Sequence, residues 1–176
     1  TRFKQDFLMD LQSMFDHLVD ITEPICQRID KTKAAMLLFD TSGIEAWVTE
    51  NNPKTLNSLI KRLKAFYRDN PDVDPYRLAY ALMPSRAASC PDAKQQYING
   101  HFCYADKFAV LTNGLGIIRH ITFLDDDFKK AHPEMTVDKK SDSPDEDKSI
   151  GDSSSLHPVL SDYFSLHPRF SPDTFL

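Results

Sequence analysis

The segment HFCYADKFAVLTNGLGIIRHITFL, residues 101–124, is the feature that most restricts how this chain can fold. Aromatic and β-branched residues, which favour strands, fill both halves of the segment. Between the halves lies Asn113-Gly114-Leu115-Gly116, and these residue types readily adopt the positive φ angles that a tight reversal needs. The pattern predicts a β-hairpin.

A second extended segment is expected earlier in the chain. Lys33 to Phe39 (KAAMLLF) is mostly apolar, which predicts a buried strand. Asp40-Thr41-Ser42-Gly43 follows and predicts the turn that ends this strand. Residues 44–48 are then expected to return from the turn as a short extended piece.

Helices are predicted around these strands. Apolar residues at three- and four-residue steps indicate an amphipathic helix over residues 2–20. The segment around Pro24 indicates either a second short helix through Ile29 or a kink in one helix. Asn52 and Asp125 or Asp126 are expected to cap two later helices. Two other segments also predict helices: DPYRLAYALM, stopped by Pro84, and SSLHPVLSDYFSLHP, in which each His-Pro pair is expected at a helix end.

Composition excludes some classes of protein. The longest apolar run is too short to cross a bilayer. The three widely spaced cysteines predict reduced thiols, and neither they nor the six histidines show metal-site spacing. A net charge of −5 disfavours binding nucleic acid over the whole surface, although a local basic strip would still release counterions. Residues 134–155 hold many acidic residues and serines but no aromatic residue, which predicts a mobile loop.

Asp40 allows two interpretations. Its carboxylate either accepts backbone N–H groups in the predicted turn, or it holds a divalent cation at the exposed end of a rigid strand. Spacing alone favours the turn. A basic face on the helix after Asn52 is a candidate DNA contact, extended by two residues of the hairpin; the proposed DNA-binding residues are Lys54, Lys61, Arg62, Lys64, Lys107 and Arg119.

Three longer stretches resemble the DDE transposases of bacterial insertion sequences: FDTSGIEAWVTENNPK, KQQYINGHFCYADKFAVLTNGLGIIRHITF and HPVLSDYFSLHPRFSPDTFL. The resemblance covers most of the chain from about Ala34 onward. It implies an α/β (α+β) fold: a truncated, ribonuclease-H-like mixed sheet with a β-hairpin, flanking helices and an N-terminal helical segment. The implied organisation is a helical segment over 1–32 and an incomplete catalytic domain over 33–176, with a helical insert at 44–100 and the acidic loop at 134–155.

In that family three carboxylates hold two Mg²⁺ or Mn²⁺ ions, which activate water or a DNA 3′-hydroxyl for in-line attack on a phosphodiester. Asp40 matches the first carboxylate, and the hairpin matches the second and third strands. The second aspartate is expected just past a strand that begins at TFL, residues 174–176, and the glutamate further on. This chain alone is therefore expected to be inactive and to bind the ions weakly.

The resemblance also implies the partners: DNA of the insertion-sequence ends and target, and further copies of the full-length protein. It implies a bacterial cytoplasmic location at the nucleoid, with no membrane. Two alternatives stay open. One is a non-catalytic regulatory module that binds DNA or a transposase, and the other is an unrelated α+β domain in which Asp40 only caps a turn.

Overall fold

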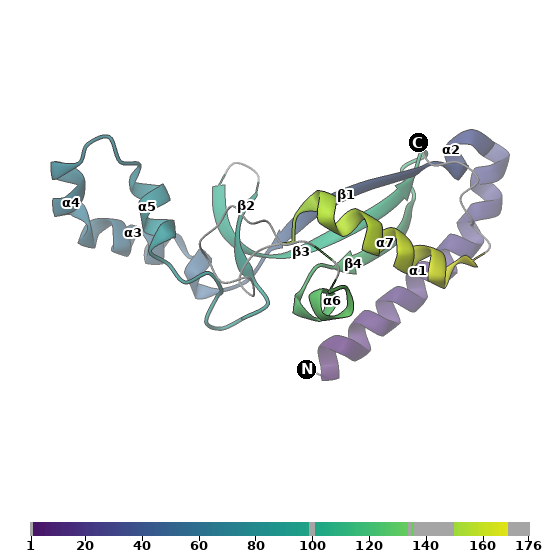
Figure 1. Cartoon of the computed structure of the whole chain (residues 1–176), viewed down its shortest axis with the longest axis horizontal. Coiled ribbons are helices and arrows are strands. Elements are labelled where there is room, and N and C mark those ends of the chain that lie inside the picture. Colours follow the sequence, from purple (N-terminus) through teal and green to yellow (C-terminus); the bar gives the residue numbers. More distant parts are fainter. Residues whose placement is uncertain (1, 99–100, 134, 136–149, 169–176) are drawn as a thin grey trace.

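A four-stranded antiparallel sheet with helices on both faces organises this chain, as shown by a computed structural model that describes residues 2–98, 101–133, 135 and 150–168 (Figure 1). This confirms the expected α+β class. In chain order the elements are α1 (Arg2–Ile29), α2 (Lys31–Ala35), β1 (Leu37–Glu45), the 3₁₀ turn η1 (Thr49–Asn51), α3 (Pro53–Arg62), α4 (Lys64–Asp69), α5 (Pro75–Ala81), β2 (Lys94–Ile98), β3 (His101–Asn113), β4 (Ile118–Phe123), α6 (Asp126–Ala131) and α7 (Asp152–Leu166).

The long strand β3 is the centre of the sheet. β1 pairs along one edge of it, from Leu37 opposite Asn113 to Glu45 opposite Ala105. The other edge is shared by β2, which pairs with residues 101–105, and β4, which pairs with residues 108–112. Within the described residues β1 has no strand on its outer edge. All three pairings are antiparallel.

The predicted hairpin is confirmed as β3 and β4. Asn113 is fully buried, and its side-chain oxygen accepts hydrogen bonds from the backbone N–H groups of Leu115 and Ile117. Gly116 has a φ of +79°, a conformation that glycine adopts without steric cost. The N–H of Gly114 donates to the carbonyl oxygen of Lys33 at 2.8 Å, which ties the hairpin loop to α2.

The predictions for the first strand are wrong in their boundaries. Lys33 belongs to α2, which Asp30 caps by accepting the Lys33 N–H. The strand begins at Leu37 and runs through Asp40-Thr41-Ser42-Gly43 to Glu45, where a turn was expected. A nine-residue ladder with β3 pairs those backbone groups of β1 that face β3, and this outweighs the local turn preference of the residues.

Adjacent residues of β4 face opposite sides of the sheet and meet different helices. His120 lies against α7, with its ring centroid 6.0 Å from that of Tyr163. Arg119 points to the other face, where its guanidinium nitrogen lies 2.8 Å from a carboxylate oxygen of Glu23 on α1. α1 is one helix with Pro24 inside it, so the single-helix alternative is the one observed.

The main core lies between the sheet and α7. It contains buried side chains from β3, the β4–α6 connection, α6 and α7, including Leu111, Phe128, Val159 and Tyr163. Phe39 of β1 packs against it. Because side chains alternate along a strand, Asp40 faces away from this core.

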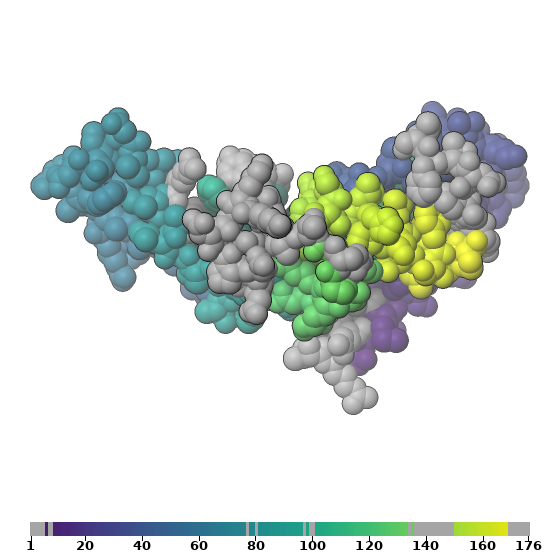
Figure 2. Space-filling model, viewed as in Figure 1, coloured from purple at the N-terminus to yellow at the C-terminus, as the bar shows by residue number. Residues whose placement is uncertain are grey.

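Residues 46–93 form the helical insert, and α3, α4 and α5 make a lobe at one end of the molecule, far from α2 at the other (Figures 1 and 2). Asn52 caps α3 as predicted, accepting the Lys54 N–H at 2.9 Å. Asn51 holds the base of the insert to β3, because its side-chain nitrogen donates to the Tyr104 carbonyl oxygen at 2.7 Å.

The C-terminal predictions are confirmed in part. Asp125 caps α6, and α7 is a helix in the expected place. Pro158 lies inside α7 and not at its end, while His167 does follow the helix. Residues 152–155 belong to α7, and Ile150 and Ser155 are buried, so the predicted loop extended too far. Apart from residue 135, its remainder at 134–149 lies outside the described residues, as does the strand expected at 174–176.

Candidate functional site

Asp40 lies in the middle of β1 and is exposed. It pairs in register with Val110 of β3, and directly opposite residues share a face of the sheet. The neighbouring exposed residue on this face of β1, Leu38, is 49% accessible. The carboxylate therefore stands on an open part of the sheet, on the strand whose outer edge has no neighbour among the described residues.

The local contacts of Asp40 leave most of its carboxylate available. One oxygen accepts the N–H of the next residue, Thr41, at 2.9 Å. This satisfies one donor, as in a turn, but the backbone is extended and the second oxygen is not constrained by this contact. The exposed carboxylate of Asp40 can therefore bind a cation, or an ion bound to a phosphate, from solvent.

The other face of β1 carries a polar contact with α7. The hydroxyl of Thr41 donates to a carboxylate oxygen of Asp152 at 2.5 Å. Lys107 donates to the same oxygen at 2.7 Å and to the carbonyl oxygen of Ile150 at 2.7 Å. The hydrogen bonds from Lys107 and Thr41 lower the pKa of Asp152. These contacts fasten the start of α7 to β1 and β3.

The predicted DNA-binding residues separate into two groups. Lys54, Lys61, Arg62 and Lys64 are exposed on α3 and α4, in the outlying lobe (Figure 2). Lys107 is occupied by the contacts with α7. Arg119 is 1% exposed and paired with Glu23 of α1. The prediction that Arg119 contacts DNA is therefore wrong, because α1 covers the face of the sheet on which this side chain lies.

A divalent-metal site does not form around Asp40 from the described residues alone. The groups of three or more His, Cys, Asp or Glu side chains within reach of one ion do not include it. A single carboxylate supplies too few oxygen ligands to hold Mg²⁺ tightly. By themselves, the described residues therefore supply one carboxylate and do not complete the two-metal centre that the resemblance implies.

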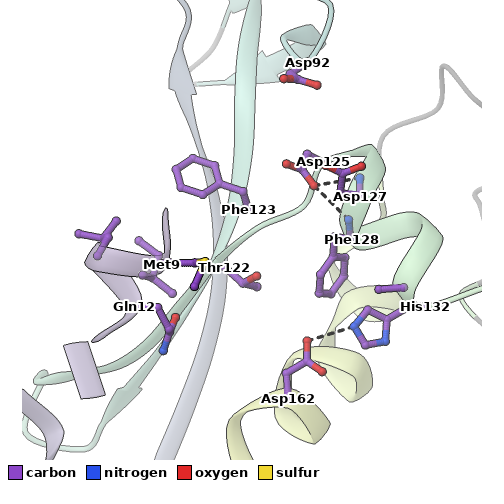
Figure 3. A pocket seen from close by; sticks show the side chains of 13 residues that line it. Met9, Gln12, Asp92, Thr122, Phe123, Asp125, Asp127, Phe128, His132 and Asp162 are labelled. Carbon is purple, nitrogen blue, oxygen red and sulfur yellow. Dashed lines mark hydrogen bonds and ion pairs between the residues drawn. The ribbon is translucent and has the colours of Figure 1, made fainter. Parts of the chain in front are cut away.

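A cavity of about 600 Å³ lies elsewhere, between α1, β4, α6 and α7 (Figure 3). Its polar wall holds His132, whose ring nitrogen lies 3.0 Å from a carboxylate oxygen of Asp162. Asp125 and Asp127 also line it, but Asp125 accepts two backbone N–H groups as the cap of α6 and Asp127 pairs with Lys130. The carboxylates of Asp125 and Asp127 therefore stabilise helix α6. Asp40 does not line this cavity.

One group of potential metal-ligating side chains was not predicted from the sequence. Glu45, His101 and Cys103 each place one ligand atom within 4.8 Å of the others. The sequence signal that would have found two of them is the His-x-Cys spacing in a strand, since residues two apart share a face. Glu45 is remote in sequence and joins them only through the β1–β3 register. A hairpin over residues 101–124 could have placed His101 opposite His120, but the observed registers place them opposite Ile98 and Leu111 respectively.

Searches with models of protein families, among curated proteins and among solved structures find no match to this chain. In the described part of the chain, no helix combines the length and the apolar character needed to cross a membrane.

Proposed function

We propose that this chain is the Asp40-bearing part of the catalytic domain of a DDE transposase from a bacterial insertion sequence. The observation that carries the proposal is the exposed carboxylate of Asp40 on β1. In the sheet β1 lies next to β3, which in turn pairs with β4. Helix α7 covers the face of the sheet opposite to Asp40. This order of a strand, a hairpin and a covering helix agrees with the ribonuclease-H-like arrangement that the resemblance implies. Among the described residues no strand pairs with the outer edge of β1, and we propose that a further strand carrying the second aspartate pairs there.

Asp40 is proposed as the first of the metal-binding carboxylates. The complete family member uses Mg²⁺ or Mn²⁺ for DNA strand cleavage and strand transfer. Because the described residues place one carboxylate at the site, we propose that this chain binds either ion at millimolar affinity or more weakly and does not cleave DNA alone. The proposed partners are insertion-sequence ends, target DNA and further copies of the full-length protein, in the bacterial cytoplasm at the nucleoid.

A second candidate is a non-catalytic module that binds DNA or a transposase. The exposed lysines and arginine of the α3–α4 lobe favour it, since phosphate contacts supply affinity without any catalytic group. The two candidates share this surface. Glu45 is the last residue of β1 before the insert, and along the strand it lies roughly 17 Å from Asp40. This distance equals the length of roughly five base pairs of duplex DNA.

The first experiment measures DNA binding as a function of salt concentration. The variant Lys61→Gln/Arg62→Gln/Lys64→Gln removes three exposed cations from the lobe. If these side chains contact phosphates, the slope of log K against log[salt] falls by up to about 3. The matched control, Arg28→Gln/Lys31→Gln/Lys33→Gln, removes the same charges from exposed positions on α1 and α2. Equal slopes in both triple variants would exclude the lobe from the interface.

The second experiment separates the two candidates through the metal. At millimolar Mn²⁺, paramagnetic broadening of backbone amide signals is expected around Asp40 and its partner Val110, and Asp40→Asn should remove it. A transposase site predicts this pattern, whereas a purely DNA-binding module predicts none. Broadening centred on Asp125 and Asp127, and unchanged by Asp40→Asn, would contradict the catalytic assignment.

A further inference from the structure

The strand geometry gathers three metal-ligating side chains at the base of the helical insert. Side chains alternate along a strand, so His101, Cys103 and Ala105 lie on one face of β3. Ala105 pairs in register with Glu45, the last residue of β1, and directly opposite residues share a face. Glu45 therefore points to the same side as the imidazole and the thiol.

The distances suit one ion. One ligand atom from each of the three residues lies within 4.8 Å of the other two, and His101 Nε2 is 3.7 Å from a carboxylate oxygen of Glu45. Zn²⁺ at the centre of a tetrahedron of sulfur, nitrogen and oxygen ligands separates them by about 3.3–3.6 Å. The Glu45 and His101 side chains are exposed, and exposed side chains change rotamer readily.

The surroundings allow an ion to enter from one side. Cys103 is 2% exposed and forms the floor, while the side chains of His101 and Glu45 are 54% and 53% exposed. Burial, and then the nearby Glu45 carboxylate, raise the pKa of the Cys103 thiol. A bound divalent cation stabilises the thiolate and therefore opposes this rise in pKa.

The donor set identifies the class of metal. Thiolate and imidazole ligands select zinc and related transition metals, whereas Mg²⁺ and Ca²⁺ take oxygen ligands. We propose that Glu45, His101 and Cys103 bind one Zn²⁺-class ion, with a fourth position left for water. Such an ion fastens the end of β1 to the start of β3, where the insert leaves the sheet. The proposal is independent of the proposed DNA function and of Asp40.

The test uses Co²⁺ as a spectroscopic probe and Zn²⁺ as its competitor, added to the purified apo chain. We expect one Co²⁺ per chain with a thiolate-to-cobalt charge-transfer band, which Zn²⁺ abolishes and excess Mg²⁺ does not. Zn²⁺ should also raise the thermal unfolding temperature. His101→Gln and Glu45→Gln change exposed side chains and should each weaken Zn²⁺ binding at least about tenfold, and Cys103→Ser should remove the band.

Matched controls test whether the effects belong to this cluster. Cys90→Ser removes a half-buried thiol and His157→Gln an exposed imidazole, both outside the three residues, and both should bind Zn²⁺ as the unaltered chain does. If Cys103→Ser fails to fold, the two exposed variants decide the question. An unchanged Zn²⁺ affinity in His101→Gln or Glu45→Gln overturns the proposal, as does a charge-transfer band that Cys90→Ser abolishes.

Discussion

The buried ion pair between Arg119 and Glu23 should be costly to break on one side, because it lies in the interior between α1 and β4. The side chains are 2% and 19% exposed, with 2.8 Å between the charged groups. Arg119 also donates to the hydroxyl of Thr22 at 3.2 Å. In Glu23→Gln the guanidinium stays buried without its carboxylate, and breaking such a pair costs about 3–5 kcal/mol.

Equilibrium unfolding in urea measures this cost. With an m-value of about 2 kcal/mol/M, Glu23→Gln should lower the midpoint by about 1.5–2.5 M. The double variant Glu23→Gln/Arg119→Met also removes the stranded charge, so it should be more stable than Glu23→Gln alone. The control Asp69→Asn breaks the exposed pair with Arg68, whose side chains are 64% and 78% exposed, and should change stability by less than about 1 kcal/mol.

Two outcomes would refute this reasoning. A Glu23→Gln variant as stable as Asp69→Asn would mean that water reaches the guanidinium of Arg119. The costs of Glu23→Gln and of Arg119→Met, each measured alone, could also add up to the cost of the double variant. Such additivity would mean that the two charges do not interact across the α1–β4 contact.

Two further predictions concern acid stability and the hairpin loop. Burial alone would raise the pKa of Asp126, but hydrogen bonds and charges from Arg86 and Lys94 lower it from 3.8 to about 2. The lowered pKa of Asp126 stabilises the folded chain above about pH 4, and this stabilisation is lost as the pH falls towards about 2. Asp126→Asn should remove at most about 2 kcal/mol of this acid-sensitive stability. An unchanged acid-unfolding curve would contradict the prediction. Gly116→Ala, at a φ of +79° with no atom within 4 Å of an added Cβ, should cost about 1 kcal/mol in thermal unfolding. Gly116→Asn should cost less, because Asn tolerates the left-handed region better than Ala; equal costs for the two variants would rule out backbone strain as the cause.

Local chemistry accounts for the parts of the fold that could be predicted. Asn52 and Asp125 cap helices because each side chain reaches N–H groups only two or three residues ahead. The β3–β4 reversal follows from Asn113 and Gly116, whose hydrogen bonds and φ angle are properties of the loop itself.

The course of β1 and the presence of β2 depend on partners distant in sequence. Asp40-Thr41-Ser42-Gly43 has the composition of a turn, yet pairing with β3 keeps it extended. β2 was not predicted, although the Asn-Gly pair at 99–100, between KQQYI and HFCY, is a sequence signal for a hairpin. The observed pairing of Ile98 with His101 agrees with that signal.

By itself, the sequence determined the hairpin, the helix caps and the residue range of the basic helix, since these depend on contacts between residues close in the chain. Only the tertiary structure decided which side chains are available for function. It buried Arg119 against Glu23, exposed Asp40 on a strand, and brought Glu45 to His101 and Cys103. Burial and cross-strand register depend on how separate segments pack together, and residue order does not specify that packing locally.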